Sequence, residues 1–175
     1  VLTGSSRLFH SLIFLAMVSH ICIANEYEET NEIEVALMAY LESVDQKDVD
    51  GILDHYYFDR RGWDRGPVLS FGKGSIREFS DPDDLRIFLE KWITSSKYMK
   101  STTLIDDLNI TLIFDGKKNR LYNADATIHR LDEFGKVIKT LRKLYYFQSD
   151  KLSEPNGSWT SWKIYMISSI DIDGT

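Results

Sequence analysis

The sequence has a single cysteine, Cys22, and no long run of lysine or arginine. One cysteine excludes an internal disulfide, and it excludes a metal site built from several thiolates. The charged residues are 27 acidic and 21 basic, which gives a formal net charge of −6. A nucleic-acid partner requires a basic face that neutralises phosphates, and an anionic membrane surface requires a basic cluster. The charge balance therefore argues against both partners.

Histidine is also scarce, with four in the whole chain. None of them lies in an HxH or HxxxH motif, and none has acidic neighbours at the spacing of metal ligands. Zinc and most transition-metal sites need such a set. We therefore expect no metal and no other cofactor.

Residues 1–24 have a different composition from the rest. Arg7 is the only charged residue there, an apolar run follows it, and Ala24 precedes the acidic segment NEYEET. A basic start, a short apolar run and a small-residue cleavage site are typical of a secretory signal peptide. The alternatives are a retained membrane anchor or a buried N-terminal helix. We expect residues 1–24 to be a signal peptide and residues 25–175 to form one domain, exported to the periplasm or secreted and free of the membrane.

Helical patterns come first along the chain. Apolar residues recur at helical spacing over residues 33–44, and Asp48 is a suitable N-cap for a second helix over residues 49–58. Asp81 and Pro82 form the start signal of a third helix, which continues through LRIFLEKWI. We thus expect three helices in the first 95 residues.

Strand patterns dominate the second half. Two short strands are expected around the turn Gly72–Gly74, and alternation continues after residue 100 with turns at Asp115-Gly116 and Gly135. The longer strands are predicted over residues 108–114, 120–131, 137–148 and 159–172. Helices followed by a long antiparallel meander define an α+β layout. Apolar residues on both faces of these strands suggest a curved sheet, closed by the three helices into a cone with a cavity at its open end.

This order of elements resembles the nuclear transport factor 2-like superfamily, and within it the SnoaL-like and ketosteroid isomerase-like branch. The segment AYLESVDQKDVDGILDHYY (residues 39–57) is similar to the first helix, the turn and the second helix of that branch. The segments ADATIHRLDEFGKVI, LYYFQ and SWTSWKI are similar to its paired strands. The resemblance covers residues 30–170 and implies a cystatin-like fold.

Ketosteroid isomerases use one tyrosine and one protonated aspartate as hydrogen-bond donors to an oxyanion, and another aspartate as the base. The resemblance puts Tyr40 at the place of the tyrosine and Asp64 near the place of the base. Tyr145 takes the place of the second donor, where the family has an aspartate. These residues also have simpler explanations: packing for Tyr40, and for Asp64 an ion pair with a nearby arginine.

Other branches of the superfamily suggest other residues. Its dehydratases use an inward histidine, and His129 takes that role if its side of the strand faces the cavity. Its epoxide hydrolases use two aspartates around an arginine. Asp125 and Arg142 lie on adjacent predicted strands, without an evident second aspartate. Alternation puts His129 and Asp125 on the same face, and the sequence leaves open which face is inward.

The aromatic residues expected to line the pocket are Tyr57, Trp63, Trp92, Phe147 and Trp162. An apolar pocket with a few polar groups suits a small hydrophobic molecule. The favoured hypothesis is an exported SnoaL-like domain that binds such a molecule without established catalysis. The alternatives are an isomerase, cyclase or dehydratase that uses acid/base chemistry, and a dimeric scaffold, since homodimers are common in this superfamily.

Overall fold

The computed structural model describes residues 27–58, 66–70, 75–95, 100–116, 120–149 and 162–171. The chain divides into two units, Val1–Glu32 and Ile33–Thr175. In the first unit, the described residues 27–32 are helical. The expected signal peptide and its cleavage after Ala24 lie outside the described residues. The sheet and the hydrophobic core belong to the second unit.

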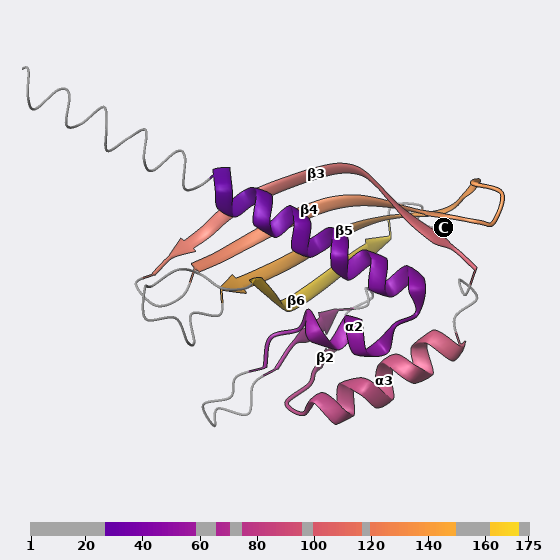
Figure 1. Cartoon of the computed structure of the whole chain (residues 1–175), viewed down its shortest axis with the longest axis horizontal. Helices are drawn as coiled ribbons and strands as arrows, with labels where there is room; N and C mark the ends of the chain where they lie inside the picture. The colour runs from indigo at the N-terminus through magenta and orange to yellow at the C-terminus, as the bar shows by residue number, and fades with distance from the viewer. Residues whose placement is uncertain are drawn as a thin grey trace, which may run out of the picture. The chain divides into compact units, whose positions relative to one another are not determined.

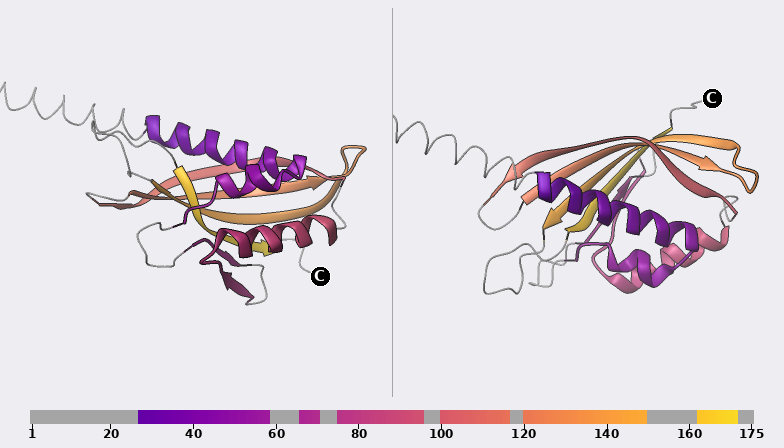
Figure 2. Two further views of the ribbon diagram at one scale, coloured as in Figure 1. Left: turned by 60° about the horizontal axis from the view of Figure 1, so that its bottom comes forward. Right: turned by 45° about the horizontal axis from the view of Figure 1, so that its top comes forward.

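The second unit is built on one six-stranded sheet with the strand order β2-β1-β6-β5-β4-β3. Its strands are β1 (Val68–Ser70), β2 (Ile76–Glu78), β3 (Thr102–Asp115), β4 (Arg120–Leu131), β5 (Val137–Ser149) and β6 (Trp162–Asp171). Neighbouring strands are antiparallel except β1 and β6, which are parallel. The long strands curve strongly (Figure 1), and Figure 2 shows the same curvature from two further sides.

Three helical segments accompany the sheet: a first helix over residues 27–46, α2 (Val49–Asp54) and α3 (Pro82–Ser95). The caps are those that the sequence predicts. The Asp48 carboxylate accepts a hydrogen bond from the Gly51 amide at 3.1 Å, and the Asp81 carboxylate accepts one from the Asp83 amide at 2.9 Å. The predicted α+β class, a curved antiparallel sheet with helices before its long strands, is confirmed.

The second helix ends earlier than predicted, at Asp54 instead of Phe58. The backbone beyond it pairs with β6: the Ile164 amide donates to the His55 carbonyl, and the Tyr57 amide donates to the Ile164 carbonyl. These tertiary hydrogen bonds replace those of a further helical turn. In the same way β3 begins at Thr102, before the predicted residue 108, because it pairs along nearly the whole of β4.

The core lies between the first helix and one face of the sheet. Every second residue of β4 from Tyr122 to Arg130 is buried, so the even positions face the core. On β5 the odd positions from Tyr145 to Ser149 are buried. Ile33, Leu37 and Leu41 of the first helix belong to the same buried cluster. Ala124 and Ala126 of β4 are both fully buried in this cluster.

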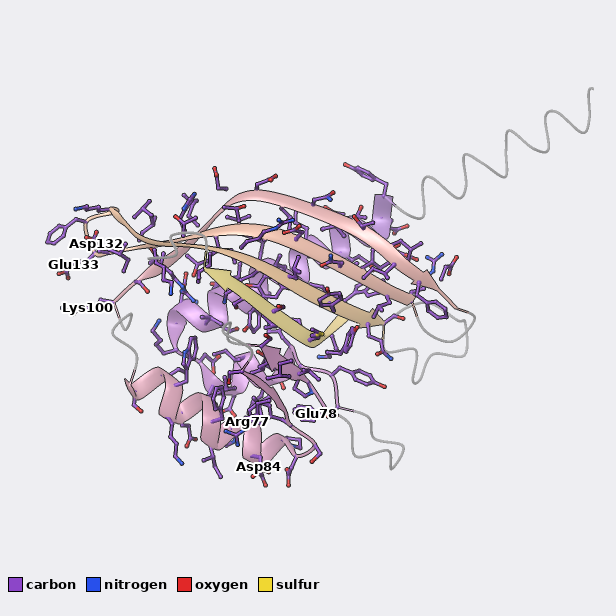
Figure 3. The ribbon with its side chains drawn as sticks, turned by 180° about the vertical axis from the view of Figure 1, so that it is seen from behind. Arg77, Glu78, Asp84, Lys100, Asp132 and Glu133 are labelled. Carbon is purple, nitrogen blue, oxygen red and sulfur yellow. The ribbon has the colours of Figure 1, made fainter. Side chains whose placement is uncertain are left out.

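Strand β2 is joined to α3 through an arginine. The Arg77 guanidinium lies 4.6 Å from the ring centre of Phe79 and 5.3 Å from that of Phe88 on α3. Figure 3 labels Arg77 beside this helix. At the far end of the sheet, Lys100 and Glu133 form an exposed ion pair at 3.6 Å, next to the β4–β5 hairpin (Figure 3).

Candidate functional site

Three tyrosines meet in the core, and we call them the tyrosine cluster: Tyr40 of the first helix, Tyr56 after α2, and Tyr145 of β5. None is more than 6% exposed. The hydroxyl oxygens of Tyr40 and Tyr56 are 3.1 Å apart and share a hydrogen bond. The rings of Tyr40 and Tyr145 are 5.9 Å apart between centroids and meet edge to face. Helical spacing turns Tyr40 inward, and strand alternation turns Tyr145 toward it.

The tyrosine cluster has unused hydrogen-bonding capacity. The Tyr145 hydroxyl is buried and has no hydrogen-bond partner among the described residues. The single bond between Tyr40 and Tyr56 uses only one of their two protons, and the structure records no other hydrogen bond of these hydroxyls among the described residues. Burying a polar group without a partner costs about 1–3 kcal/mol. Such a cost is offset when a bound molecule supplies the missing acceptor.

Burial also fixes the protonation state of these hydroxyls. Desolvation raises the pKa of Tyr40, against the opposing effects of the Tyr56 hydrogen bond and of Arg130. Desolvation also raises the pKa of Tyr56 and of Tyr145 well above the usual value of 10.0. All three tyrosines are therefore neutral near pH 7. They act as hydrogen-bond donors and not as bases.

A polar network lies at the end of the first helix. The Asp45 carboxylate accepts hydrogen bonds from the Thr103 amide at 2.7 Å, the Thr103 hydroxyl at 2.6 Å and the Arg130 guanidinium at 2.9 Å. Arg130 also donates to the Thr103 hydroxyl at 2.6 Å. The side chain of Arg130 is only 7% exposed, so its charge is compensated inside the protein.

Lys143 lies two residues before Tyr145 on β5 and therefore on the same, core-facing side of the strand. Its side chain is partly buried, and its ammonium nitrogen lies 5.9 Å from the centre of the Tyr145 ring. Burial lowers the pKa of Lys143 from 10.5 to about 7, and the positive charges of Arg130 and Lys139 act in the same direction. Asp45 opposes this shift.

His129, Asp125 and Arg142 lie on the other face of the sheet. His129 occupies an odd position of β4, where the buried residues are even, and its Nδ1 lies 3.0 Å from the Thr140 hydroxyl. Its Nε2 lies 3.5 Å from Asp106. Asp125 and Arg142 pair with each other on that face at 2.5 Å and 2.9 Å. The structure therefore brings Tyr40 and Tyr145 together and leaves His129 on the opposite side of the sheet.

The expected pocket residues occupy different environments. Phe147 is fully buried and Trp162 is 6% exposed, both within the core, where Trp162 contacts Tyr122 edge to face at 5.2 Å. Trp92 of α3 is partly buried against this core. Tyr57 is also partly buried, beside β6. Trp63 and Asp64 lie outside the described residues, so the role of Asp64 as a base stays a prediction.

Sequence reasoning missed two parts of this site. It did not single out Lys143, although the alternation Lys143, Tyr145, Phe147 is visible in KLYYF and would have placed all three on one face. The Asp45–Arg130 pair carries no local signal, because its members are 85 residues apart. Tyr57 is the residue predicted to line the pocket, whereas the structure buries its neighbour Tyr56.

The described part of the chain offers neither a metal site nor a membrane-spanning helix. It holds no group of three or more histidine, cysteine, aspartate or glutamate side chains arranged to bind a metal ion. No helix within residues 27–58 or 75–95, the helical stretches described, has the length and apolar character needed to cross a membrane.

Comparison with known proteins identifies the fold. No model of a known protein family matches the chain, and no curated protein matches it. Solved structures do match. A ketosteroid isomerase-like protein from Erwinia carotovora atroseptica has a TM-score of 0.52 and 14% identity, over 83% of this chain and 97% of that one. A candidate scytalone dehydratase from Novosphingobium aromaticivorans has a TM-score of 0.56 and 13% identity, over 83% and 85%.

A third match is a candidate dehydratase of the nuclear transport factor 2-like family from Streptomyces avermitilis. Its TM-score is 0.54 at 9% identity, over 84% of this chain and 98% of that one. The chain therefore has the nuclear transport factor 2-like fold, and the resemblance predicted from its sequence is confirmed at the level of the fold. At these identities the likeness extends to the fold alone.

Proposed function

We propose that the chain binds a small, largely apolar molecule carrying a carbonyl or hydroxyl oxygen, and that the tyrosine cluster receives this oxygen. The observation that supports the proposal best is the buried Tyr145 hydroxyl, which has no partner among the described residues. A buried donor without an acceptor is uncommon in native proteins, and it often marks a functional group.

The rings and hydroxyls of the tyrosine cluster indicate which kind of ligand would fit. Tyr40, Tyr56 and Tyr145 present apolar rings, and burial keeps their hydroxyls protonated. Neutral donors among apolar rings suit a neutral oxygen acceptor on a hydrophobic body. The bond to Tyr145 orients the ligand, and contact with the rings contributes most of the binding free energy.

Isothermal titration calorimetry with a matched pair of probes tests this proposal. The first is 2-acetylnaphthalene, which has a carbonyl oxygen. The second is 2-isopropenylnaphthalene, a hydrocarbon of the same shape. We expect the ketone to bind more tightly by about five- to tenfold, the worth of one hydrogen bond. Tyr145→Phe should abolish the difference between the probes.

Tyr146→Phe is the matched control. Tyr146 is the next residue on β5, so its side chain points to the opposite face, where its ring contacts Tyr165. The preference for the ketone should be unchanged in this variant. Equal binding of the two probes to the wild-type protein, or a preference that survives Tyr145→Phe, would contradict the proposal.

A second candidate function is catalysis of the isomerase, cyclase or dehydratase kind. It is favoured by the contact between Tyr40 and Tyr145, since two neutral tyrosines can stabilise a developing oxyanion. In this candidate Asp64 moves the proton. Asp64→Asn should then abolish turnover of a substrate while the melting temperature stays near that of the wild type. Unchanged turnover would exclude Asp64 as the base.

We also propose export directed by residues 1–24. The support is the basic start and the apolar run that precede Ala24. N-terminal sequencing of the protein recovered outside the cytoplasm should begin at Asn25. A protein retained in the cytoplasm with residues 1–24 intact would contradict export.

A further inference from the structure

Strand β3 forms one edge of the sheet, with β4 on one side and no strand of the described residues on the other (Figure 1). It is long for a strand, from Thr102 to Asp115. Among the described residues, its outer edge receives a hydrogen bond at Thr103 alone, where the amide donates to the Asp45 carboxylate. A row of unpaired amides and carbonyls is a template for pairing with another extended chain.

Two irregularities in the pairing with β4 divide this edge. They lie between Ile105 and Asp107 and between Leu112 and Phe114. Such bulges are one way in which proteins interrupt a sheet edge. The stretch between them, residues 107–112, pairs with β4 without a break and is about 20 Å long. It therefore offers a regular edge to an added strand of the same length.

The direction of the backbone groups in this stretch follows from the pairing. Thr103 lies opposite Arg130, and its amide turns away from β4. In an antiparallel pair, every second residue turns its amide and carbonyl away from the partner strand. Counting in twos along β4 from Arg130 shows which residues opposite it do the same: Leu108, Ile110 and Leu112.

The same three residues carry the apolar side chains of the stretch. They are partly buried against the hydrophobic core, so apolar surface remains beside their free backbone groups. The residues between them are polar, exposed and on the opposite face: Asp107, Asn109 and Thr111. A strand added at this edge thus meets apolar side chains on one face and polar side chains on the other.

The charge of β3 favours a basic occupant. The strand has aspartates but no lysine or arginine. Asp115 pairs with Arg120, and Asp106 lies 3.5 Å from His129, whereas no ion pair of Asp107 is recorded among the described residues. The whole chain has a net charge of −6, so two copies joined at β3 would bring like charges together.

We propose that residues 107–112 of β3 are a docking site for an extended segment of a partner protein, in which apolar residues alternate with lysine or arginine. The segment adds one strand to the sheet. Its apolar side chains cover Leu108, Ile110 and Leu112, and its basic side chains lie on the face of Asp107. The site lies outside the tyrosine cluster, so the inference goes beyond the proposed function and stands if ligand binding to Tyr145 fails.

Binding of a synthetic peptide to the full chain tests this inference. The probe has about seven residues, lysine alternating with valine, and a fluorophore at its N-terminus, and fluorescence anisotropy follows its binding. Methylation of the valine backbone nitrogens removes the amides that face β3, so the affinity should fall at least about tenfold. Methylation of the inner lysine nitrogens, which face away, should change it by less than about twofold. A probe with glutamate in place of lysine should bind at least about tenfold more weakly.

Hydrogen exchange followed by nuclear magnetic resonance distinguishes the possible occupants of the edge. In the free protein the Ile110 amide should exchange at least about tenfold faster than the Thr111 amide, which faces β4, and the peptide should remove this difference. Protection of Ile110 in the free monomer would show that another segment of this chain covers the edge. Protection that appears only as the protein concentration rises would show that a second copy does. Either result would overturn the inference.

Three variants complete the test. Ile110→Pro removes an amide that points to the free edge, a position where strands tolerate proline, and should abolish peptide binding. Asp107→Lys should weaken binding of the lysine probe at least about fivefold and strengthen binding of the glutamate probe. Asp84→Lys makes the same change of charge on α3 and should leave both affinities within about twofold. Equal effects of the two charge variants, or of the two methylations, would overturn the inference.

Discussion

Asp45 of the first helix and Arg130 of β4 are 85 residues apart in sequence and 2.9 Å apart in the fold. Thr103 of β3 completes the contact with two hydrogen bonds to the same carboxylate. One carboxylate thus joins the helix to two strands of the sheet. The first helix carries Tyr40, so this contact also helps to set where Tyr40 meets Tyr145.

Removal of Asp45 should be strongly destabilising. Asp45→Ala leaves the charge of the buried Arg130 without its acid and leaves the Thr103 amide without an acceptor, so we expect a loss of about 3–5 kcal/mol in the free energy of unfolding. Urea denaturation measures it. Asp125→Ala is the control, because its partner Arg142 is 54% exposed, and it should cost about 1 kcal/mol or less. Equal losses in the two variants would contradict the role of burial.

The tyrosine cluster predicts opposite effects for two similar substitutions. Tyr145→Phe removes a buried hydroxyl without a partner among the described residues, so stability should stay the same or rise by about 1 kcal/mol. Tyr40→Phe removes one half of the hydrogen bond to Tyr56 and should cost about 1 kcal/mol. Both are measured by urea denaturation of the protein without ligand. A clear loss of stability in Tyr145→Phe would show that its hydroxyl has a partner.

The lowered pKa of Lys143 predicts how stability depends on pH. Between about pH 7 and 10.5 the unfolded chain keeps the proton on this lysine and the folded chain loses it. The unfolded state therefore binds more protons, and the contribution of Lys143 to stability becomes more favourable as the pH rises through this window. Below about pH 7 both states are protonated, and the cost of the buried charge is fully present.

Comparison of the wild type with Lys143→Met isolates this effect. The variant should be the more stable protein at pH 6, and its advantage should shrink by at least about 1 kcal/mol between pH 7 and pH 9.5. Thermal unfolding followed by circular dichroism at several pH values measures the difference. A difference that does not change with pH would show that Lys143 has an ordinary pKa.

Substitution of Gly66 by alanine should lower the stability of the fold strongly. A Cβ atom at this position would lie 1.8 Å from the Phe79 carbonyl oxygen, so Gly66→Ala forces the backbone to shift and should cost about 3 kcal/mol or more. Gly135 is the control. It has a positive φ of 78° but open space around its Cβ position, so Gly135→Ala should cost only about 1 kcal/mol of backbone strain. Similar losses at the two positions would contradict the steric argument.

Local signals in the sequence were sufficient for most elements. The Asp81-Pro82 start signal and the Asp48 cap are read from neighbouring residues, and both are confirmed. The strand over residues 120–131 has the bounds predicted from its alternation. The end of α2 was wrong, because Tyr56 and its neighbours pair with Ile164, more than a hundred residues away, and no local pattern reports such a contact.

The same distinction between local signals and long-range contacts applies to the candidate site. The sequence by itself determined that Tyr40 lies on the apolar stripe of a helix and that His129 shares a strand face with Asp125. Only the tertiary structure decided which face is inward, because alternation has two equivalent choices until a helix covers one of them. That choice put Tyr145 and Lys143 toward the core and His129 on the opposite face. The Tyr145 hydroxyl, which has no hydrogen-bond partner in the part of the chain that the structure describes, and the lowered pKa of Lys143 follow from burial and neighbouring charge. Both arise only when distant segments pack together.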